Sequence, residues 1–239
     1  MSSSLPLVGV SFPLFSPTQI AGLKLWLKAD ALVLNDADPV TTWADASASG
    51  NDATQTTAAN KPTYRSNVVN GKPAVRFDGA NDFLQFADVF SLLSAGEIFI
   101  VVKIDADPPG AAAQTGLWTL GSDTQNTHFP FTDGTIYDQF GTTVRKATAD
   151  PTPLLTSFRL YNVSSASGNW TSRLNSSQIF TTATNTVGFT TAPVLGAGVG
   201  GATYFLDGDI AEVILYDAAL SSGNRANVES YLNSKYALY

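Results

Sequence analysis

The carboxyl groups of this chain are too scattered to suggest a hydrolase. Enzymes that cleave glycosidic bonds use two carboxyl groups held roughly 5–9 Å apart, one of them as the acid. On a strand such a pair would alternate, as in Glu-x-Asp-x-Glu, whereas the glutamates here are only Glu97, Glu212 and Glu229, far apart in the sequence. No Gly-x-Ser-x-Gly turn and no phosphate-binding glycine loop occurs. We predict that the chain is not an enzyme, with an aspartate-based site from distant loops as the open alternative.

Nitrogen and sulfur ligands for a metal are almost absent. The chain has one histidine, His128, and no cysteine, so a closed zinc site would need several carboxylates. Two loops hold the oxygen ligands that calcium prefers, namely Asp45, Asn51 and Asp52 in one and Asp78, Asn81 and Asp82 in the other. These residue types are also ordinary in turns, and neither loop has EF-hand spacing. We favour structural turns and no required cofactor, and one bound Ca²⁺ stays open.

Aromatic and polar residues mix between Asp105 and Gly201 in a way that is typical of a saccharide site. Aromatic faces stack on sugar rings, and amide, imidazole and carboxylate groups bond their hydroxyls. The predicted ligand contacts in or beside this region are Trp118, His128, Tyr137, Trp170 and Tyr204. Because Trp and Tyr are mostly buried in folded proteins, a place in the core is the competing interpretation for each aromatic.

Composition narrows the class of protein. The 239 residues are 44% hydrophobic and 14% charged, which suits one large folded domain and excludes a disordered chain. The formal net charge of −7, with no cluster of Lys or Arg, argues against nucleic acid and anionic membrane surfaces as partners. No apolar run is long enough to insert into a membrane.

Many short strands must position these side chains. Segments that combine strand-forming residues with flanking turns are Leu23–Lys28, Ala74–Phe77, Phe83–Phe86, Glu97–Ile104, Gly116–Leu120, Phe129–Phe131, Thr135–Phe140, Leu154–Val163, Asn169–Leu174, Val194–Gly196 and Ile210–Tyr216. Their number predicts two packed sheets. From Ile98 to Ile104 both alternating faces are apolar apart from Lys103, which predicts a central strand covered on both sides.

A short helix is predicted to close the chain. Ser221 or Ser222 can cap its start, and apolar residues then recur at helical spacing, at Val228, Tyr231, Leu232 and Tyr236. Glu212 lies within an apolar strand nearby. We predict that Glu212 is structural and pairs with Arg76 across neighbouring strands.

Four segments together resemble one family. The end of the chain, with Gly208-Asp-Ile-Ala-Glu-Val213, Leu220-Ser221 and Tyr231-Leu-Asn-Ser-Lys-Tyr236, is similar to the end of laminin-G-like jelly-roll domains, the concanavalin A-like lectin/glucanase sandwiches. Segments 20–30, 43–55 and 70–84 resemble that family's opening strand, its Trp-x-Asp-x-Ser-Gly-Asn loop and its Asn-Gly-x-Pro-x-Val-x-Phe-Asp-Gly segment. The resemblance implies an all-β, two-sheet antiparallel sandwich with a short C-terminal helix, and a fold that usually binds and seldom catalyses.

The chain divides into an arm, residues 1–17, and a sandwich domain, residues 18–239. The arm is uncharged, and its large apolar residues include the predicted assembly contacts Leu7, Val10, Phe12, Leu14 and Phe15. Soluble monomers avoid exposing such a patch, so we expect the arm to pack on another subunit or on a capsid or tail protein. Without a basic leader, and with its apolar run broken by proline, the N-terminus does not predict a signal peptide.

Two functional classes fit these observations. The first is a non-catalytic protein of a virus particle, of the kind that resembles this family in bacteriophages, made in the host cytoplasm and either decorating the capsid or forming part of a tail or fibre. It would bind capsid or tail proteins, and host-surface polysaccharide is its candidate ligand. The alternative is an extracellular bacterial carbohydrate-binding or adhesin domain.

Overall fold

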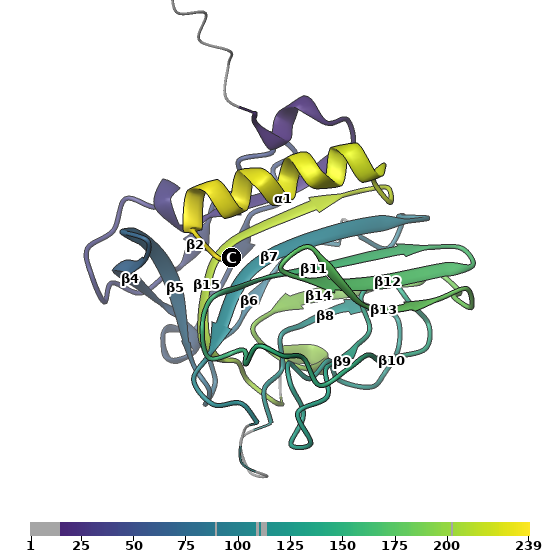
Figure 1. The fold of residues 1–239 in the computed structure, drawn as a ribbon. Coiled ribbons are helices and arrows are strands. Elements are labelled where there is room, and N and C mark those ends of the chain that lie inside the picture. Colours follow the sequence, from purple (N-terminus) through teal and green to yellow (C-terminus); the bar gives the residue numbers. More distant parts are fainter. Residues whose placement is uncertain (1–14, 89, 109, 111–113, 202) are drawn as a thin grey trace, which may run out of the picture.

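The computed structural model describes residues 15–88, 90–108, 110, 114–201 and 203–239. The chain forms two antiparallel sheets packed face to face, and one helix lies across the outer face of the larger sheet (Figure 1). The predicted all-β sandwich with a C-terminal helix is confirmed. No helix among the described residues is long and apolar enough to cross a membrane.

The larger sheet has eight strands in the order β13-β12-β11-β7-β15-β5-β4, with β1 pairing beside β5 along the length of β15. Their bounds are β1 Leu23–Lys28, β4 Thr63–Val69, β5 Lys72–Asp78, β7 Gly96–Ile104, β11 Arg159–Ala166, β12 Asn169–Leu174, β13 Ser177–Thr182 and β15 Asp207–Tyr216. Sequence-distant β7 and β15 are therefore central neighbours.

The smaller sheet has five strands in the order β2-β3-β6-β14-β8, and β9 and β10 form a separate pair. The bounds are β2 Thr42–Trp43, β3 Ala53–Thr54, β6 Leu84–Gln85, β8 Trp118–Gly121, β9 Tyr137–Asp138, β10 Lys146–Ala147 and β14 Phe189–Leu195. Short 3-10 turns occur at η1 Pro17–Gln19, η2 Ala29–Ala31, η3 Ala58–Asn60 and η4 Val199–Gly201. In Figure 1 the β9-β10 pair lies at the end of the molecule away from the helix.

Strand β7 is covered on both faces, as its sequence predicts. Ile98, Ile100 and Val102 point into the core between the sheets. Phe99 and Val101 point to the outer face and pack in a second core beneath the helix. Burial on both sides explains the apolar run at both alternating positions.

Helix α1, Ser222–Tyr236, begins at the predicted cap, because the Ser221 hydroxyl accepts the backbone N–H of Asn224. Two ion pairs with buried glutamates fasten it to the sheet. Arg225 in its first turn bonds both carboxylate oxygens of Glu97 on β7, and Lys235 in its last turn bonds Glu212 on β15 at 2.7 Å. Both glutamates are fully buried.

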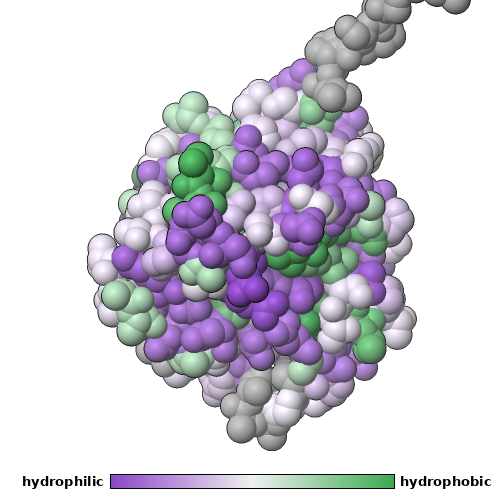
Figure 2. All heavy atoms as spheres, turned by 90° about the vertical axis from the view of Figure 1, so that its left-hand side faces the viewer, coloured by the Kyte–Doolittle hydropathy of each residue, from purple (hydrophilic) through white to green (hydrophobic). Residues whose placement is uncertain are grey.

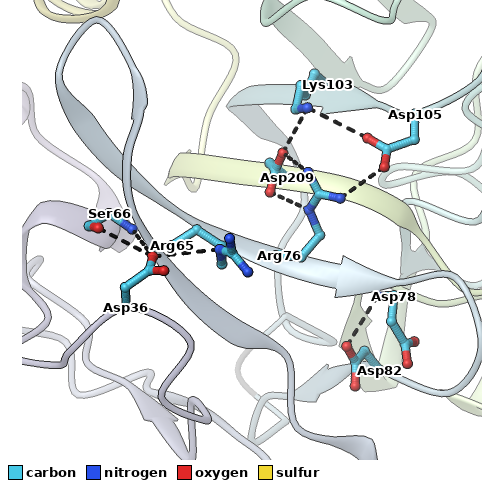
Figure 3. Close-up of polar contacts among 9 residues, drawn as sticks. All are labelled: Asp36, Arg65, Ser66, Arg76, Asp78, Asp82, Lys103, Asp105 and Asp209. Carbon is cyan, nitrogen blue, oxygen red and sulfur yellow. Dashed lines mark hydrogen bonds and ion pairs between the residues drawn. The ribbon is translucent and has the colours of Figure 1, made fainter.

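The predicted pair of Arg76 with Glu212 is wrong. Arg76 on β5 stands opposite Asp209, and both of its bonds to that carboxylate are short, at 2.6 and 2.7 Å (Figure 3). Asp105 and Lys103 complete this ion network. Glu212 lies three residues beyond the position opposite Arg76, and a β-bulge between Ile210 and Glu212 turns its side chain to the face that the helix covers.

Other strand predictions need correction at their limits. Phe129–Phe131 is not a strand, because its pairing is confined to an isolated bridge between His128 and Tyr137. Predicted strands at Asn169–Leu174 and Leu23–Lys28 have the observed bounds. The sequence did not predict β2, β3, β4, β10 and β13, which are short or rich in polar residues.

Candidate functional site

Two of the five predicted ligand contacts belong to the core. Trp118 and Trp170 are both 0% exposed, so neither can stack on a ligand at the surface. The Trp118 ring stacks on Tyr161, and its indole N–H donates to Asp138. The indole of Trp170 donates to the backbone oxygen of Phe140. Because both buried indole N–H groups have an acceptor, their hydrogen bonds offset the free-energy cost of removing them from water.

The other three predicted contacts lie together. His128 has its ring centroid 4.9 Å from that of Tyr204 and 6.4 Å from that of Tyr137. Phe131 joins them, 4.9 Å from His128 and 5.6 Å from Tyr137. We call these four residues the aromatic cluster. Tyr204 is 38% exposed and His128 is 4% exposed, so the histidine forms the floor and Tyr204 the accessible edge.

A local β-bridge and a tight turn position the cluster. His128 and Tyr137 exchange backbone hydrogen bonds of 2.8 and 3.0 Å, which makes their side chains neighbours. Between them the chain turns at Asp133-Gly134, where Gly134 has φ of 82° and its N–H donates to Phe131. Glycine adopts this left-handed conformation without strain. The spacing of Phe131 and Tyr137 is therefore set by the turn.

A second loop brings Tyr204 to the cluster. The Asn126 side-chain oxygen accepts the backbone N–H of Val199 at 2.7 Å and the Thr203 hydroxyl at 3.4 Å. These bonds join the loop after β14 to the loop before β9. Tyr204 follows directly, in a left-handed backbone conformation with φ of 52°. The site is thus built from two loops at one end of the sandwich.

Charged groups surround the aromatic rings. The Arg145 guanidinium lies 4.8 Å above the Tyr137 ring, and the Tyr137 hydroxyl donates to Asp133 at 3.2 Å. Burial, together with the nearby Arg145, lowers the pKa of His128 to about 4, so its imidazole is neutral at pH 7. A hydrogen bond from the Thr135 backbone lowers the pKa of Asp133. A neutral floor with a half-buried cation and an exposed carboxylate beside it can bond sugar hydroxyls.

Sequence reasoning missed Phe131 and Arg145 as members of the site. Phe131 lies three residues after His128, so proximity could have suggested it. Arg145 is seventeen positions away from His128 and reaches Tyr137 only because β10 pairs with β9. That pairing could not be predicted, since both strands are two residues long.

The candidate calcium loops use their carboxylates on their own backbone. Asp45 accepts the backbone N–H groups of Trp26, Ser47 and Asn51. Asp78 accepts those of Ala80 and Asn81. Among the described residues, no group of three or more His, Asp or Glu side chains is arranged to hold a metal ion.

Asp82 is the unusual acid of the second loop. It is 5% exposed and accepts the backbone N–H of Asp78 at 3.1 Å (Figure 3). Burial, assisted by the charge of Asp78, raises the pKa of Asp82 to about 7. One carboxylate oxygen of Asp82 thus accepts from the backbone of its own loop, which favours the structural interpretation of this loop.

Two hollows lie away from the aromatic cluster. One, of about 450 Å³, runs along α1 and is lined by Phe15, Asn227, Ser230, Tyr231, Ser234 and Lys235. The other, of about 290 Å³, is lined by Leu32, Val33, Leu34, Pro39, Thr41 and Thr42. The face that carries β4 and β5 is mostly hydrophilic, with hydrophobic residues in small separate groups (Figure 2).

Of the five predicted assembly contacts, only Phe15 lies among the described residues. Leu7, Val10, Phe12 and Leu14 lie outside the described residues. Phe15 packs edge-on against Tyr231 of its own chain, with ring centroids 6.3 Å apart. The Tyr216 hydroxyl donates to the backbone oxygen of Pro17. Phe15 and Pro17 therefore contact the sandwich domain of their own chain.

Comparison with known proteins places the fold among β-sandwiches. The binding domain of Paraclostridial Mosquitocidal Protein 1 has a TM-score of 0.62 and 13% identity, over 92% of this chain and 53% of that one. Domain 4 of AbnA, a GH43 extracellular arabinanase from Geobacillus stearothermophilus solved with arabinotriose, has a TM-score of 0.59 and 13% identity, over 87% of this chain and 98% of that one.

A Trypanosoma rangeli sialidase in complex with 2,3-difluorosialic acid has a TM-score of 0.61 and 14% identity, over 98% of this chain and 36% of the sialidase. The chain thus spans about a third of the sialidase chains. At these identities the likeness shows the β-sandwich fold alone. No protein-family model matches the sequence, and no curated protein does.

Proposed function

We propose that this protein is a non-catalytic binding domain that recognises saccharide at the aromatic cluster. The observation that carries the proposal is the accessible ring of Tyr204 set against the buried, neutral His128, with Tyr137 and Phe131 beside them. Aromatic rings at a surface lower the cost of dehydrating the apolar face of a sugar. The site lies on loops at one end of a rigid sandwich, where binding residues are commonly found.

Polar groups around the rings suit hydroxyl recognition. Asp133 offers carboxylate oxygens, and Arg145 offers N–H groups, both at the rim of the cluster. Gln125 is exposed beside them, and its backbone oxygen accepts the Gln139 side chain. A few fixed polar groups around an apolar surface are the usual composition of a small-ligand site.

The descriptions of two structural neighbours support saccharide as the class of ligand. The arabinanase domain is described with arabinotriose, and the mosquitocidal fragment is described as a binding domain. Both have the same sandwich fold. Their ligands belong to those proteins, and they favour saccharide as the first ligand class to test here.

The glutamates favour a role without catalysis. Glu97 and Glu212 are each bonded to a cation of α1, on the face of the large sheet that the helix covers. Acid catalysis of glycoside cleavage needs a carboxyl group that reaches the substrate. Prolonged incubation of the purified protein with polysaccharide is expected to release no reducing sugar. Steady release, abolished by one Asp substitution, would overturn the non-catalytic assignment.

The setting in which the domain is displayed forms a second part of the proposal. We favour a virus particle, as a capsid decoration or a tail or fibre component, because the arm before Phe15 is uncharged and apolar and suits attachment to another protein. Extracellular bacterial adhesion is the alternative. Mass spectrometry of purified particles would find the chain in stoichiometric amount in the first case and absent in the second.

Binding is tested by replacing Tyr204. Tyr204→Ala should weaken binding to a glycan array about five- to twelvefold, because stacking on an exposed ring contributes about 1–1.5 kcal/mol. Tyr239→Ala is the matched control, since Tyr239 is 54% exposed but lies at the C-terminus. The wild type should bind weakly as a monomer and more strongly on a multivalent support. If neither format binds any glycan, the saccharide assignment is wrong.

A further inference from the structure

Arg145 differs from Arg76 and Arg225 in how its donors are used. Arg76 and Arg225 each bond two oxygens of a buried carboxylate. Arg145, like Arg159 and Arg173, has no carboxylate within ion-pair distance in the part of the chain that the structure describes. Its Nη1 donates to the backbone oxygen of Asn126 at 2.9 Å, and its guanidinium lies over a ring of the aromatic cluster. Most of the five N–H donors of this guanidinium therefore have no acceptor among the described contacts.

The orientation of Arg145 is fixed from two sides. Its backbone N–H is bonded by Asp123, and its guanidinium lies over the Tyr137 ring at 4.8 Å. The guanidinium N–H groups that the described contacts leave unused match the two oxygens of a carboxylate. The arginine is thus prepared for an acidic group before any ligand arrives.

No other charged group described near the aromatic cluster is as well placed as Arg145 to bind an acidic ligand. His128 is neutral at pH 7 and adds no second cation to the site. Lys146 follows Arg145, but its ammonium donates to the backbone oxygen of Thr184, on the connection between β13 and β14. Asp123 accepts two backbone N–H groups, and Asp133 accepts the Thr135 N–H and the Tyr137 hydroxyl. Both carboxylates are engaged with donors of the loop.

Resting on the saccharide function proposed above, we propose that the aromatic cluster selects acidic sugars, with Arg145 receiving the sugar carboxylate while Tyr204 supports the ring. The protein carries a net charge of −7, so long-range attraction cannot draw an acidic glycan to it. Selection must therefore be local, by hydrogen bonding within the roughly 8 Å over which charges act at physiological salt. A uronic or sialic acid presents the required combination of carboxylate, hydroxyls and ring.

The test compares sugars that differ only in the carboxyl group. The probes are oligogalacturonides and sialyllactose, each beside its methyl ester, with binding measured by calorimetry at fixed salt. Wild type should bind at least one acid about tenfold more tightly than its ester, as expected for one charge-assisted hydrogen-bonded pair. Arg145→Gln should bind acid and ester alike, and Arg145→Lys should keep only part of the preference because it loses the planar fork.

Arg65→Gln on β4 is the control, since it removes the same charge at an edge of the large sheet and outside the β9-β10 pair. It should retain the wild-type preference, and melting curves should show that all three variants are folded. Equal wild-type binding of acid and ester, or a preference unchanged in Arg145→Gln, would overturn the inference and leave the saccharide function standing. Failure of the wild type to bind any glycan, neutral or acidic, would refute both.

Discussion

The carboxylate of Glu212 holds the closing helix to the sheet, and its removal should destabilise the fold severely. Glu212 is fully buried and accepts four donors, from Trp26 at 2.6 Å, Lys235 at 2.7 Å, Tyr236 at 2.8 Å and Tyr231 at 2.9 Å. Burial, together with the Glu212 charge, raises the pKa of both tyrosines. Their hydroxyls therefore stay protonated and remain donors over the accessible pH range.

The cost of Glu212→Ala can be worked from these contacts. Breaking a buried ion pair costs about 3–5 kcal/mol when a charge is left alone. Here Lys235 keeps Asp30 at 2.9 Å, so its charge retains a partner. The indole of Trp26 and the hydroxyl of Tyr236 lose a buried acceptor, at about 1–3 kcal/mol each. We expect a loss of about 4 kcal/mol in unfolding free energy, or about 8–16 °C in Tm for a domain of this size.

Urea unfolding followed by circular dichroism measures this loss. Asp30→Ala removes the other partner of Lys235, which is partly exposed, and should cost less than about 1 kcal/mol. Glycan binding should be unchanged in both variants. A Glu212→Ala protein that loses less than about 1 kcal/mol would refute the assignment of the carboxylate as a buried anchor. Normal stability with lost binding would make Glu212 part of a site instead.

Two further predictions concern the pH dependence of stability and the arm. The pKa of Asp82 is raised above its unfolded value, so its contribution to the free energy of unfolding is fully present below about pH 4 and is lost as pH rises through about 7. Asp82→Asn should therefore flatten the pH dependence of stability and be more stable than wild type at pH 8. Equal stability of the two proteins at pH 8 in urea unfolding would contradict this prediction. Removing residues 1–14 should leave a folded sandwich with unchanged Tm, because Phe15 and Pro17 themselves contact the sandwich. In a reconstitution assay the truncated protein should no longer join its particle or oligomer. Normal assembly of the truncated chain would rule out the arm as an assembly element.

The sequence predicts the sheets well where burial imposes a pattern. The apolar run of β7 predicts a central strand because both faces must be covered, and the structure places separate cores on the two sides. The helix is predicted with its cap because Ser221 and the apolar spacing are local signals. Short strands such as β9 and β10 carry no such pattern, since two residues cannot show a period.

Register is the information that a single sequence lacks. Arg76 and Glu212 do lie on directly paired strands, yet the register of β5 against β15 places Asp209 opposite Arg76 and leaves Glu212 three residues further along. Composition alone gives no preference between Asp209 and Glu212 as its partner. The error in the predicted ion pair is therefore an error of register within a correct strand pairing.

The same limit applies to the predicted ligand contacts. Trp118 and Tyr204 have similar chemistry, but the first lies in a strand of the smaller sheet and the second follows a loop. A side chain in a core strand is buried by the facing sheet, whereas a loop residue at the end of the sandwich keeps one side in water. Position in the fold, which residue type does not reveal, separates the site from the core.

The buried glutamates that hold α1 and the aromatic cluster lie in different parts of the molecule, so we expect changes in stability and changes in binding to be separable. Figure 1 places α1 on the outer side of the large sheet and the β9-β10 pair at the end of the molecule away from the helix. The buried pairs of Glu97 and Glu212 act on the outer core, while Arg145 and Tyr204 lie on loops that contribute little to it. Sites that share no contacts usually have additive effects. A double variant, Glu212→Gln with Tyr204→Ala, should therefore combine the stability loss of one and the binding loss of the other. Coupling larger than about 0.5 kcal/mol in either quantity would show that the two ends communicate through the sheets.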